Sequence, residues 1–404
     1  MTNRQCSKTR SLHSIITNAF KKRKSFLDDI FFGRSQVLLT NEQHMRLAVE
    51  WLAKAQDSQS DDGVSALYSV TDSWDVSYPE TTGYIIPTLL NYYHLTGQSI
   101  WRGRAMRMAD WLLSIQLSEG GFPERCELRT PLVFDTGQII FGLIGAYRET
   151  KTIKYLDSAI RAVKWLISVQ EPTGNWLQYS YGGISHTYYT RVAWALLEVF
   201  CEWNDDTLLL AAKKNLNWVN DQQLGNGWFQ NSSFSTDEYP SLHTIAYTAQ
   251  GLLESGKILR DDKYIEAAIK VADTLLVRQK QDGALYGVFD QDWQPPVNWI
   301  CLTGVAQMSI IWLTLFQLSR NEAYLLAAKK ANAYLKSTQK VDSDDPGIKG
   351  GIKGSHPING AYSPYTYPNW ATKFFLDALM LENKAAALQD DPKSVGRGFL
   401  EVKG

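Results

Sequence analysis

The amino-acid sequence predicts an all-α protein in which six helical hairpins form a closed double ring. Three observations predict this fold. One motif recurs six times, the helices between its copies are strongly apolar, and no long stretch alternates apolar and polar residues as an extended sheet would. A repeat of this length, kept over six copies, indicates one structural unit that is stacked repeatedly.

Each copy of the motif places a tryptophan, or a residue in its position, five residues before a glutamine, and a glycine turn follows. The pairs are Trp51/Gln56, Trp111/Gln116, Trp165/Gln170, Trp218/Gln223, Thr274/Gln279 and Tyr334/Gln339. Successive copies are 60, 54, 53, 56 and 60 residues apart. In the third copy Ala159, Ala162, Val163, Leu166 and Ile167 form a one-sided apolar stripe, which is typical of an amphipathic outer helix.

The helix that follows each turn is apolar on most sides, which indicates burial. These helices are expected at Thr81–Tyr93, Asp135–Tyr147, Tyr188–Phe200, His243–Glu254, Cys301–Phe316 and Asn369–Met380. Six amphipathic helices outside six apolar ones give an (α/α)6 toroid. We assign the toroid to residues 41–383, a basic amphipathic arm to residues 1–40 and a flexible tail to residues 384–404.

One segment of the third copy carries a family resemblance. Residues Arg161 to Trp176 resemble the "QW" repeat of terpenoid cyclases and protein prenyltransferases. The same double-ring fold also houses six-hairpin glycosidases, polysaccharide lyases and sugar epimerases. The resemblance covers roughly residues 43–382. It implies the fold and leaves the activity open, because a fold alone does not supply a function.

The catalytic motifs of the isoprenoid-processing families are incomplete in this sequence or lie at unsuitable positions. Residues Asp342 to Asp345 match the DxDD motif of triterpene cyclases, but Pro346-Gly347 follows, as in a surface turn. Cys301 resembles a zinc ligand of the prenyltransferase β subunit, whereas Trp299 and Asn369 stand where an aspartate and a histidine are required. We therefore expect no metal and no cofactor.

The net charge and the N-terminal segment limit the kinds of binding partner that the sequence predicts. The net charge of −1 gives no reason to expect nucleic-acid binding. Leu12, Ile15, Ile16, Ala19 and Phe20 form an apolar stripe before the basic residues 21–24, which is a pattern suited to an anionic membrane surface. We favour an arm packed on the toroid and keep peripheral membrane contact as the alternative. No secretion signal is recognisable, so a cytoplasmic location is expected.

The loops that lead into the inner helices should meet at one mouth of the ring, where helix N-termini carry a partial positive charge. Glu80 and Asp135 begin neighbouring inner helices, and such a pair can act as acid and base on a glycosidic bond. The alternative is that Asp135 only caps its helix. The six glutamines of the repeated motif, by contrast, are expected to have a structural role at the ends of the outer helices.

A second group of candidates suits removal of a proton beside a uronate carboxylate. It comprises His186, Tyr189, Arg191, His243 and Tyr247, because such a step needs a base and a group that steadies the carboxylate. The alternative is ordinary core packing of these side chains.

Substrate-binding candidates are the aromatic, amide and cationic residues of the same loops. They are Trp74, Tyr78, Trp293, Asn298, Trp299, Asn369, Trp370 and Lys373. The set predicts an enzyme that cleaves a glycosidic bond in a uronate-containing oligo- or polysaccharide, by hydrolysis or β-elimination. An isoprenoid-processing toroid, a sugar epimerase and a non-catalytic glycan-binding toroid remain as alternatives.

Overall fold

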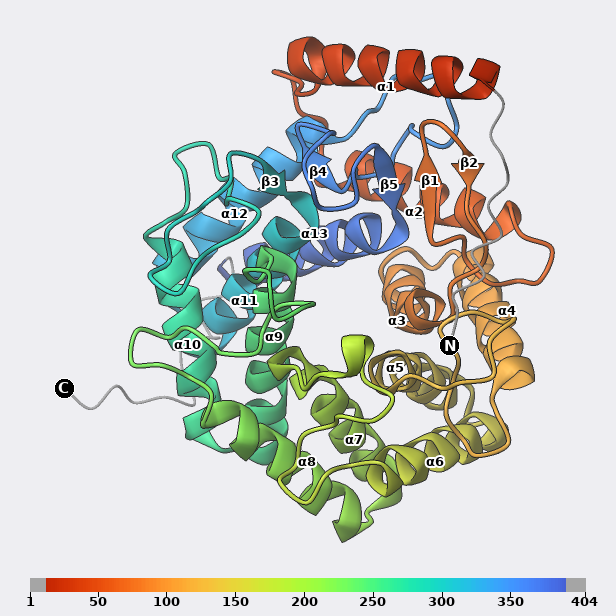
Figure 1. Ribbon diagram of the computed structural model, residues 1–404, viewed down its shortest axis with the longest axis vertical. Helices are drawn as coiled ribbons and strands as arrows, with labels where there is room; N and C mark the ends of the chain where they lie inside the picture. Colours follow the sequence, from red (N-terminus) through yellow and green to blue (C-terminus); the bar gives the residue numbers. More distant parts are fainter. Residues whose placement is uncertain (1–11, 390–404) are drawn as a thin grey trace.

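Two concentric rings of helices make up the computed structural model, which describes residues 12–389 (Figure 1). The outer ring contains α2 (Asn41–Asp57), α4 (Ser99–Ile115), α6 (Ile153–Ser168), α8 (Asp206–Asn220), α10 (Asp262–Leu276) and α12 (Glu322–Thr338). The inner ring contains α3 (Pro79–Thr96), α5 (Val133–Thr150), α7 (Thr190–Trp203), α9 (Leu242–Leu259), α11 (Leu302–Ser319) and α13 (Asn369–Gln389). The predicted (α/α)6 toroid is confirmed.

Contacts between the helices close both rings. Each inner helix packs against the next, and α13 returns to contact α3. Each inner helix also packs on the outer helix that follows it, while α13 packs on α2, so the two ends of the toroid are joined. Each packed hairpin therefore consists of an inner helix and the outer helix that follows it. Each sequence repeat, by contrast, begins with an outer helix and ends with the next inner helix. The long loops from outer to inner helices all lead to one mouth.

The loops at this mouth carry only short strands. β1 (Leu67–Ser69) pairs with β2 (Ser73–Trp74) and with β5 (Thr366–Pro368), and β3 (Ile300–Cys301) pairs with β4 (Ser355–His356). All pairings are antiparallel. The 3-10 turns Tyr181–Gly183 and Thr187–Tyr189 precede α7. The second turn occupies the position where the sequence predicted the start of α7, and that helix begins at Thr190 instead.

The repeated glutamines hold neighbouring repeats together, as the structural interpretation predicted. The Nε2 of Gln170 donates to the carbonyl of Gly174 at 2.9 Å and to that of Ala211 on the next outer helix at 3.0 Å. The other five glutamines make the same double bridge from their own turn to the next outer helix. Gly174 has φ +97°, and a Cβ there would lie 2.4 Å from the carbonyl oxygen of Lys214.

Helix α13 is longer than predicted. It runs to Gln389, so residues 384–389 of the expected tail are helical, while residues 390–404 and 1–11 lie outside the described part of the chain. Within residues 12–389, one helix is long and apolar enough to cross a membrane, namely α11. Because 83% of that helix is buried in the inner ring, its composition reflects the core of the toroid.

Helix α1 (Leu12–Phe32) packs across the outside of the toroid, beside the loops of the last repeat (Figure 1). Its buried Asp29 forms an ion pair with Lys353 and accepts a hydrogen bond from the backbone N–H of Ile358 at 2.8 Å. His356 Nδ1 lies 3.3 Å from the same carboxylate. The prediction of an arm packed on the toroid is confirmed for this helix.

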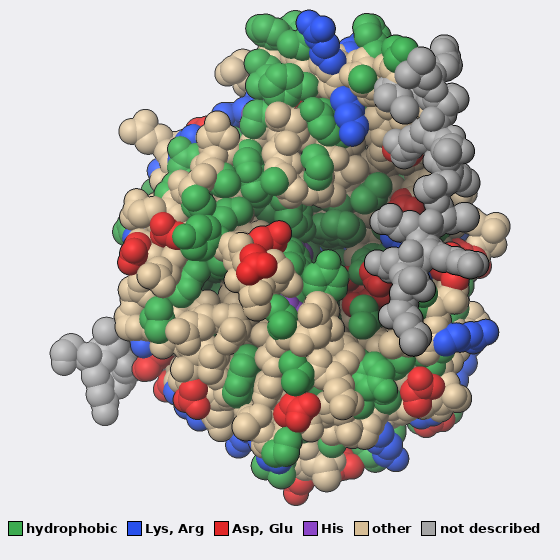
Figure 2. Space-filling model, viewed as in Figure 1, with side chains coloured by type: hydrophobic (Ala, Val, Ile, Leu, Met, Phe, Trp, Pro, Cys, Tyr) green, Lys and Arg blue, Asp and Glu red, His purple; other side chains and the backbone are tan. Residues whose placement is uncertain are grey.

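The opposite side of α1 is exposed and apolar. Ile16, Phe20, Leu27 and Phe31 lie at i, i+4, i+11 and i+15 and share one face. Their exposed fractions are 62%, 69%, 42% and 72%, and the basic residues 21–24 adjoin them. Figure 2 shows this green and blue surface at the top of the molecule. Contact with an anionic membrane remains a prediction, and the exposed stripe is what motivates it.

Candidate active site

A cavity of about 520 Å³ opens at the mouth formed by the N-terminal ends of the inner helices. Figure 2 shows a hollow near the centre of the molecule, lined by hydrophobic side chains and bordered by acidic ones. Its lining comprises Tyr78, Glu80, Tyr84, Glu124, Phe134, Asp135, Tyr181, Tyr188, Phe234, Glu238, His243, Tyr247, Ala361, Tyr362, Ser363 and Trp370. The expectation that inner-ring N-termini converge on a shared pocket is therefore confirmed. We call it the upper cavity.

Glu80 lies in the first turn of α3, directly after Pro79, whose fixed φ suits the start of a helix. The side chain is buried, and this burial raises the pKa of Glu80 to about 7. A hydrogen bond from the Tyr78 hydroxyl and the positive charge of Arg191 oppose that rise. Glu80 is thus a carboxyl group that changes protonation near neutral pH, as a catalytic acid or base requires.

Asp135 occupies the first turn of α5, the inner helix next to α3. Burial, and then the negative charge of Glu80, raise the pKa of Asp135 well above its usual range. Its Oδ2 is buried and has no hydrogen-bond partner among the described residues, while a hydrogen bond from its own backbone N–H partly opposes the rise in pKa. Asp135 thus interacts with the N-terminus of α5, and the capping alternative stays open beside the catalytic one. Two carboxyl groups that share one cavity hold at least one proton between them near neutral pH.

His243 begins α9 and is neutral in this environment. Its Nδ1 lies 2.8 Å from the Oε1 of Gln307, which assigns the proton to Nδ1 and leaves Nε2 as an acceptor. Burial lowers the pKa of His243 to about 3. The ring packs on Tyr247, with 4.2 Å between centroids, and on Tyr362 at 5.4 Å. His243 can accept a hydrogen bond or a proton in the cavity.

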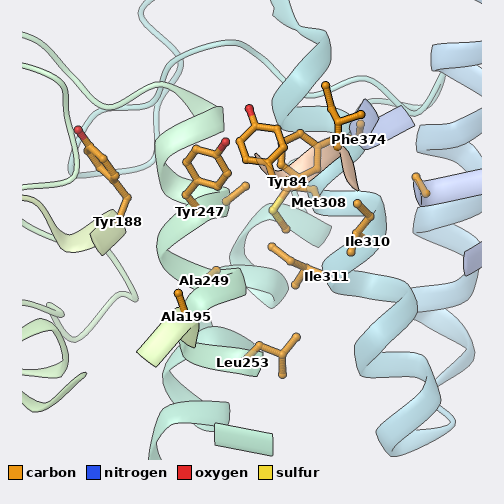
Figure 3. Packing of buried hydrophobic residues seen from close by; sticks show 14 of the residues in the cluster. Tyr84, Tyr188, Ala195, Tyr247, Ala249, Leu253, Met308, Ile310, Ile311 and Phe374 are labelled. Atoms are coloured by element: carbon orange, nitrogen blue, oxygen red, sulfur yellow. The ribbon is translucent and has the colours of Figure 1, made fainter. Parts of the chain in front are cut away.

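Aromatic rings form the walls and the floor of the upper cavity. Phe134 packs against Tyr188 and Tyr247, and the indole of Trp370 donates to the hydroxyl of Tyr362 at 2.8 Å. Below them Tyr84, Tyr247 and Phe374 form a layer across the axis of the toroid (Figure 3). This layer separates the upper cavity from the opposite end of the ring.

The rim of the cavity is acidic. Glu124 and Glu238 join Glu80 and Asp135 in the lining, and no lysine or arginine of residues 12–389 takes part in it. Hydrogen bonds from these side chains to a ligand therefore involve hydroxyl groups, carboxyl groups and the Nε2 of His243. A site of this composition suits a polyol whose ring faces pack on aromatic side chains.

Six of the predicted site residues line the upper cavity: Tyr78, Glu80, Asp135, His243, Tyr247 and Trp370. Arg191 and Lys373 do not, although both lie on inner helices. Both line a different cavity beneath the aromatic layer. Arg191 is the second residue of α7, but the 3-10 turn Thr187–Tyr189 precedes that helix and carries Tyr188, which does line the upper cavity. Lys373 is the fifth residue of α13, one turn after Asn369.

His186 and Tyr189 are held in the protein interior beside the cavity. His186 Nδ1 and Nε2 lie 3.0 and 2.8 Å from the carbonyl oxygens of Ser233 and Tyr181. The Tyr189 hydroxyl accepts from the backbone N–H of Tyr181 at 3.0 Å. Both side chains fix the loop that carries Tyr181 into the cavity. Neither residue lines the upper cavity, and their catalytic role stays a prediction.

The remaining binding candidates lie outside the cavity as well. Trp74 packs on Trp51, with 5.1 Å between centroids. Asn369 is buried and donates to the carbonyl of Ser65 and to Thr81. The other three are Trp293, which packs on Trp228, Trp299, which packs over Gly287, and the exposed Asn298. These loop residues stabilise the wall of the mouth, and their prediction as substrate-binding groups is not supported.

Several cavity residues escaped prediction. Tyr84 lies one helical turn after Glu80, at the spacing that also joins His243 to Tyr247, and this spacing was a usable signal. Tyr362 comes from a long loop between β4 and β5, and Glu124 from the loop before α5. No periodic pattern marks such loop positions.

Comparison with known proteins agrees with this fold. Residues 125–305 match the family model of the ulvan lyase N-terminal domain. The structure resembles an unsaturated glucuronyl hydrolase specific for heparin, with a TM-score of 0.69 and 18% identity over 86% of this chain and 98% of that chain. It also resembles the unsaturated glucuronyl hydrolase of Bacillus sp. GL1, with a TM-score of 0.67 and 17% identity over 89% and 100%.

A third similar structure is cellobiose 2-epimerase from Bacillus thermoamylovorans B4167, with a TM-score of 0.65 and 14% identity over 83% and 97% of the two chains. No curated protein matches the sequence. At these identities the likeness establishes the fold, a six-hairpin glycosidase-like toroid of the kind found in carbohydrate-active proteins.

Proposed function

We propose that the protein hydrolyses the glycosidic bond of a terminal uronyl residue in an oligosaccharide. The observation that carries this proposal is the Glu80–Asp135 pair, two buried carboxyl groups of raised pKa in one cavity. Glycoside hydrolysis needs one carboxyl group that is protonated and one that is ionised, and a coupled pair provides both states near neutral pH.

Roles for the two groups follow from their environments. Asp135, whose pKa is raised by burial and by the charge of Glu80 and whose Oδ2 has no partner among the described residues, would donate its proton to the oxygen of the leaving sugar. Glu80, with a pKa of about 7 and a hydrogen bond from Tyr78, would act as the ionised partner that takes a proton from water. Water then adds to the terminal sugar, the glycosidic bond breaks, and the Asp135 proton leaves on the released oligosaccharide.

Attack at a chain end is supported by the aromatic packing at the base of the cavity. Tyr84 and Tyr247, which line the cavity, both pack on the ring of Phe374. A pocket with aromatic rings at its base would accept the end of a chain rather than its middle. Its volume of about 520 Å³ lies within the range of ordinary small-ligand sites.

The uronyl specificity rests on the similar proteins, which are named as glucuronyl hydrolases, and on the ulvan lyase family match. In this cavity a substrate carboxylate would be received by hydroxyl donors such as those of Tyr78, Tyr188 and Tyr362. β-Elimination has less support, because it needs a cationic group to neutralise the carboxylate and no described lysine or arginine lines the cavity.

An ultraviolet assay on two substrates separates these reactions. Release of a 4,5-unsaturated uronyl sugar destroys the conjugated double bond as the free sugar opens to a keto acid, so absorbance falls. Elimination in an intact uronate polysaccharide creates the double bond, so absorbance rises. We expect a fall with unsaturated disaccharides and no rise with the polysaccharide. A rise with the polysaccharide would instead establish a lyase, and no change with either would favour binding without catalysis.

Sugar epimerisation is the second candidate, and the similarity to cellobiose 2-epimerase motivates it. Epimerisation at a carbon beside a carbonyl needs a base that is unprotonated at working pH. His243 is unprotonated there, but its pKa of about 3 makes it a weak base, so this candidate has less support than hydrolysis. Incubation with cellobiose, followed by NMR of the products, tests it. A new 2-epimer that disappears in His243→Ala would support this alternative.

A further inference from the structure

A second cavity, of about 310 Å³, lies beneath the aromatic layer on the opposite side of the toroid. It is lined by later turns of the inner helices, including Thr88 and Asn91 on α3, Gly145 on α5 and Trp194 on α7. Tyr84 lines both cavities and belongs to the layer between them. We call this space the lower cavity.

The two cavities differ in charge. The lower cavity is lined by four cationic side chains, Arg148, Arg191, Lys373 and Lys384, and by two carboxylates, Glu198 and Asp377. The formal balance is 4 − 2 = +2 for the same lining. The upper cavity has four carboxyl groups and no lysine or arginine in its lining, and burial favours the uncharged form of two of these, Glu80 and Asp135. Cationic side chains are thus found in the lining of the lower cavity and not in that of the upper one.

Arg191 is the main reason to expect an anion. Its side chain is 2% exposed, and its hydrogen bonds among residues 12–389 go to neutral amides, the Oε1 atoms of Gln138 and Gln250, each at 2.7 Å. The charges of Glu80 and Asp377 act on Arg191, but neither carboxyl group forms an ion pair with it among these residues. Lys373 and Arg148, by contrast, form ion pairs with Asp377 and Glu198 at 2.6 Å. A buried cation without a paired carboxylate is costly unless a counter-charge reaches it.

Further groups in the lining can complete an anion site. The Thr88 hydroxyl is buried and has no hydrogen-bond partner in the described part of the chain. Asn91 and Gln250 add amide groups, and the rings of Phe141 and Trp194 form an apolar wall with 4.5 Å between centroids. The Arg191 guanidinium lies 5.2 Å from the Trp194 ring and 5.3 Å from the Phe141 ring, which hold its plane in place. A planar guanidinium held in this way presents fixed donors to a carboxylate or phosphate.

We propose that the lower cavity is a second binding site, for a small oxyanion such as a carboxylate or phosphate group that meets Arg191, with Thr88 as a further donor. The site is separate from the upper cavity and does not depend on the proposed hydrolysis. Occupation would neutralise the buried guanidinium and stabilise the folded protein.

Calorimetric titration with inorganic phosphate, at low ionic strength and neutral pH, tests the site. Gly145→Met is the blocking variant, because a Cβ at Gly145 meets its nearest neighbour at 3.7 Å and the longer side chain extends into the lower cavity. Gly103→Met is the matched control, since Gly103 lies exposed on α4 with nothing within 4 Å of an added Cβ. A parallel titration with succinate shows whether phosphate or carboxylate binds more tightly.

We expect saturable binding of one anion per chain to the unmodified protein and to Gly103→Met, and at least about tenfold weaker binding to Gly145→Met. Thr88→Val, which removes one donor at constant size, should weaken binding by about threefold to tenfold. Absence of saturable binding at millimolar anion, or equal binding by Gly145→Met, would overturn the proposal. Circular dichroism confirms that each variant is folded. Because the readout is anion binding, failure here leaves the hydrolysis proposal untouched.

Discussion

Replacement of Glu80 by glutamine should make the protein more stable while it removes activity. Glutamine has nearly the same shape and can still accept the hydrogen bond from Tyr78, but it cannot be ionised. In the folded protein burial raises the pKa of Glu80 from 4.5 to about 7. The folded state therefore binds more protons than the unfolded state between these values, and stability falls as pH rises through this window.

The size of the effect follows from the same shift. A difference of about 2.5 pKa units, at about 1.4 kcal/mol each, means that ionised Glu80 costs the folded state about 3 kcal/mol above pH 7. Glu80→Gln should recover an amount of that order at pH 8 and almost none at pH 4. Turnover should fall by about 10² to 10⁴-fold, which is the usual contribution of a general acid or base.

Urea unfolding at pH 4 and pH 8, together with initial rates on an unsaturated disaccharide, measures both effects. Glu266→Gln, at an exposed position on α10, is the matched control and should change neither quantity. If Glu80→Gln unfolds more easily at pH 8 yet remains active per folded molecule, then Glu80 is a structural carboxylate and the assignment of the site is wrong.

Three other perturbations probe the scaffold and α1. Gln170→Leu removes two hydrogen bonds between neighbouring repeats and should lower the free energy of unfolding by about 2 kcal/mol in urea titrations. Asp29→Asn leaves Lys353 buried without its partner and should cost about 3–5 kcal/mol, with a loss of activity because the adjoining loop carries cavity residues. Phe20→Ser combined with Phe31→Ser should abolish sedimentation with vesicles that contain anionic lipid, if the exposed stripe of α1 contacts membranes.

The predictions for Asp29 and for the stripe of α1 each have a matched control. Asp28→Asn changes the exposed neighbour of Asp29 on the same helix and should leave stability unchanged. The double variant Leu210→Ser and Leu326→Ser removes two exposed apolar side chains on outer helices. It should sediment with the vesicles to the same extent as the unmodified protein. Absence of vesicle binding by the unmodified protein would refute the membrane prediction. An unchanged unfolding curve for Gln170→Leu would show that the repeated glutamine adds nothing to stability.

The fold was predictable because it is built from six copies of one structural unit. Six copies of a short motif fix the helix boundaries closely, and the bridge made by Gln170 shows why the motif contains glutamine and glycine together. The inner helices were recognisable because burial on all sides requires an apolar composition, as in α11. The regular spacing of residues in the sequence thus predicts which helical side chains pack against neighbouring helices.

The candidate site was predictable only in part. Glu80, Asp135 and His243 were found because each begins an inner helix, and the helix start fixes its level in the ring. Arg191 lines the lower cavity although it is the second residue of α7, because the 3-10 turn Thr187–Tyr189 precedes this helix and Tyr188 of that turn lies at the mouth instead. Tyr362 was missed because its position depends on the path of a loop, which no local pattern encodes.

The central claim, that Glu80 and Asp135 act on a sugar in the upper cavity, is tested most directly by a crystal structure. Asp135→Asn crystals would be soaked with an unsaturated uronyl disaccharide. The account predicts an intact disaccharide with its glycosidic oxygen within hydrogen-bonding distance of residue 135 and its terminal ring against the aromatic wall. A sugar bound elsewhere on the protein, with the upper cavity occupied by solvent alone at saturating ligand, would contradict it.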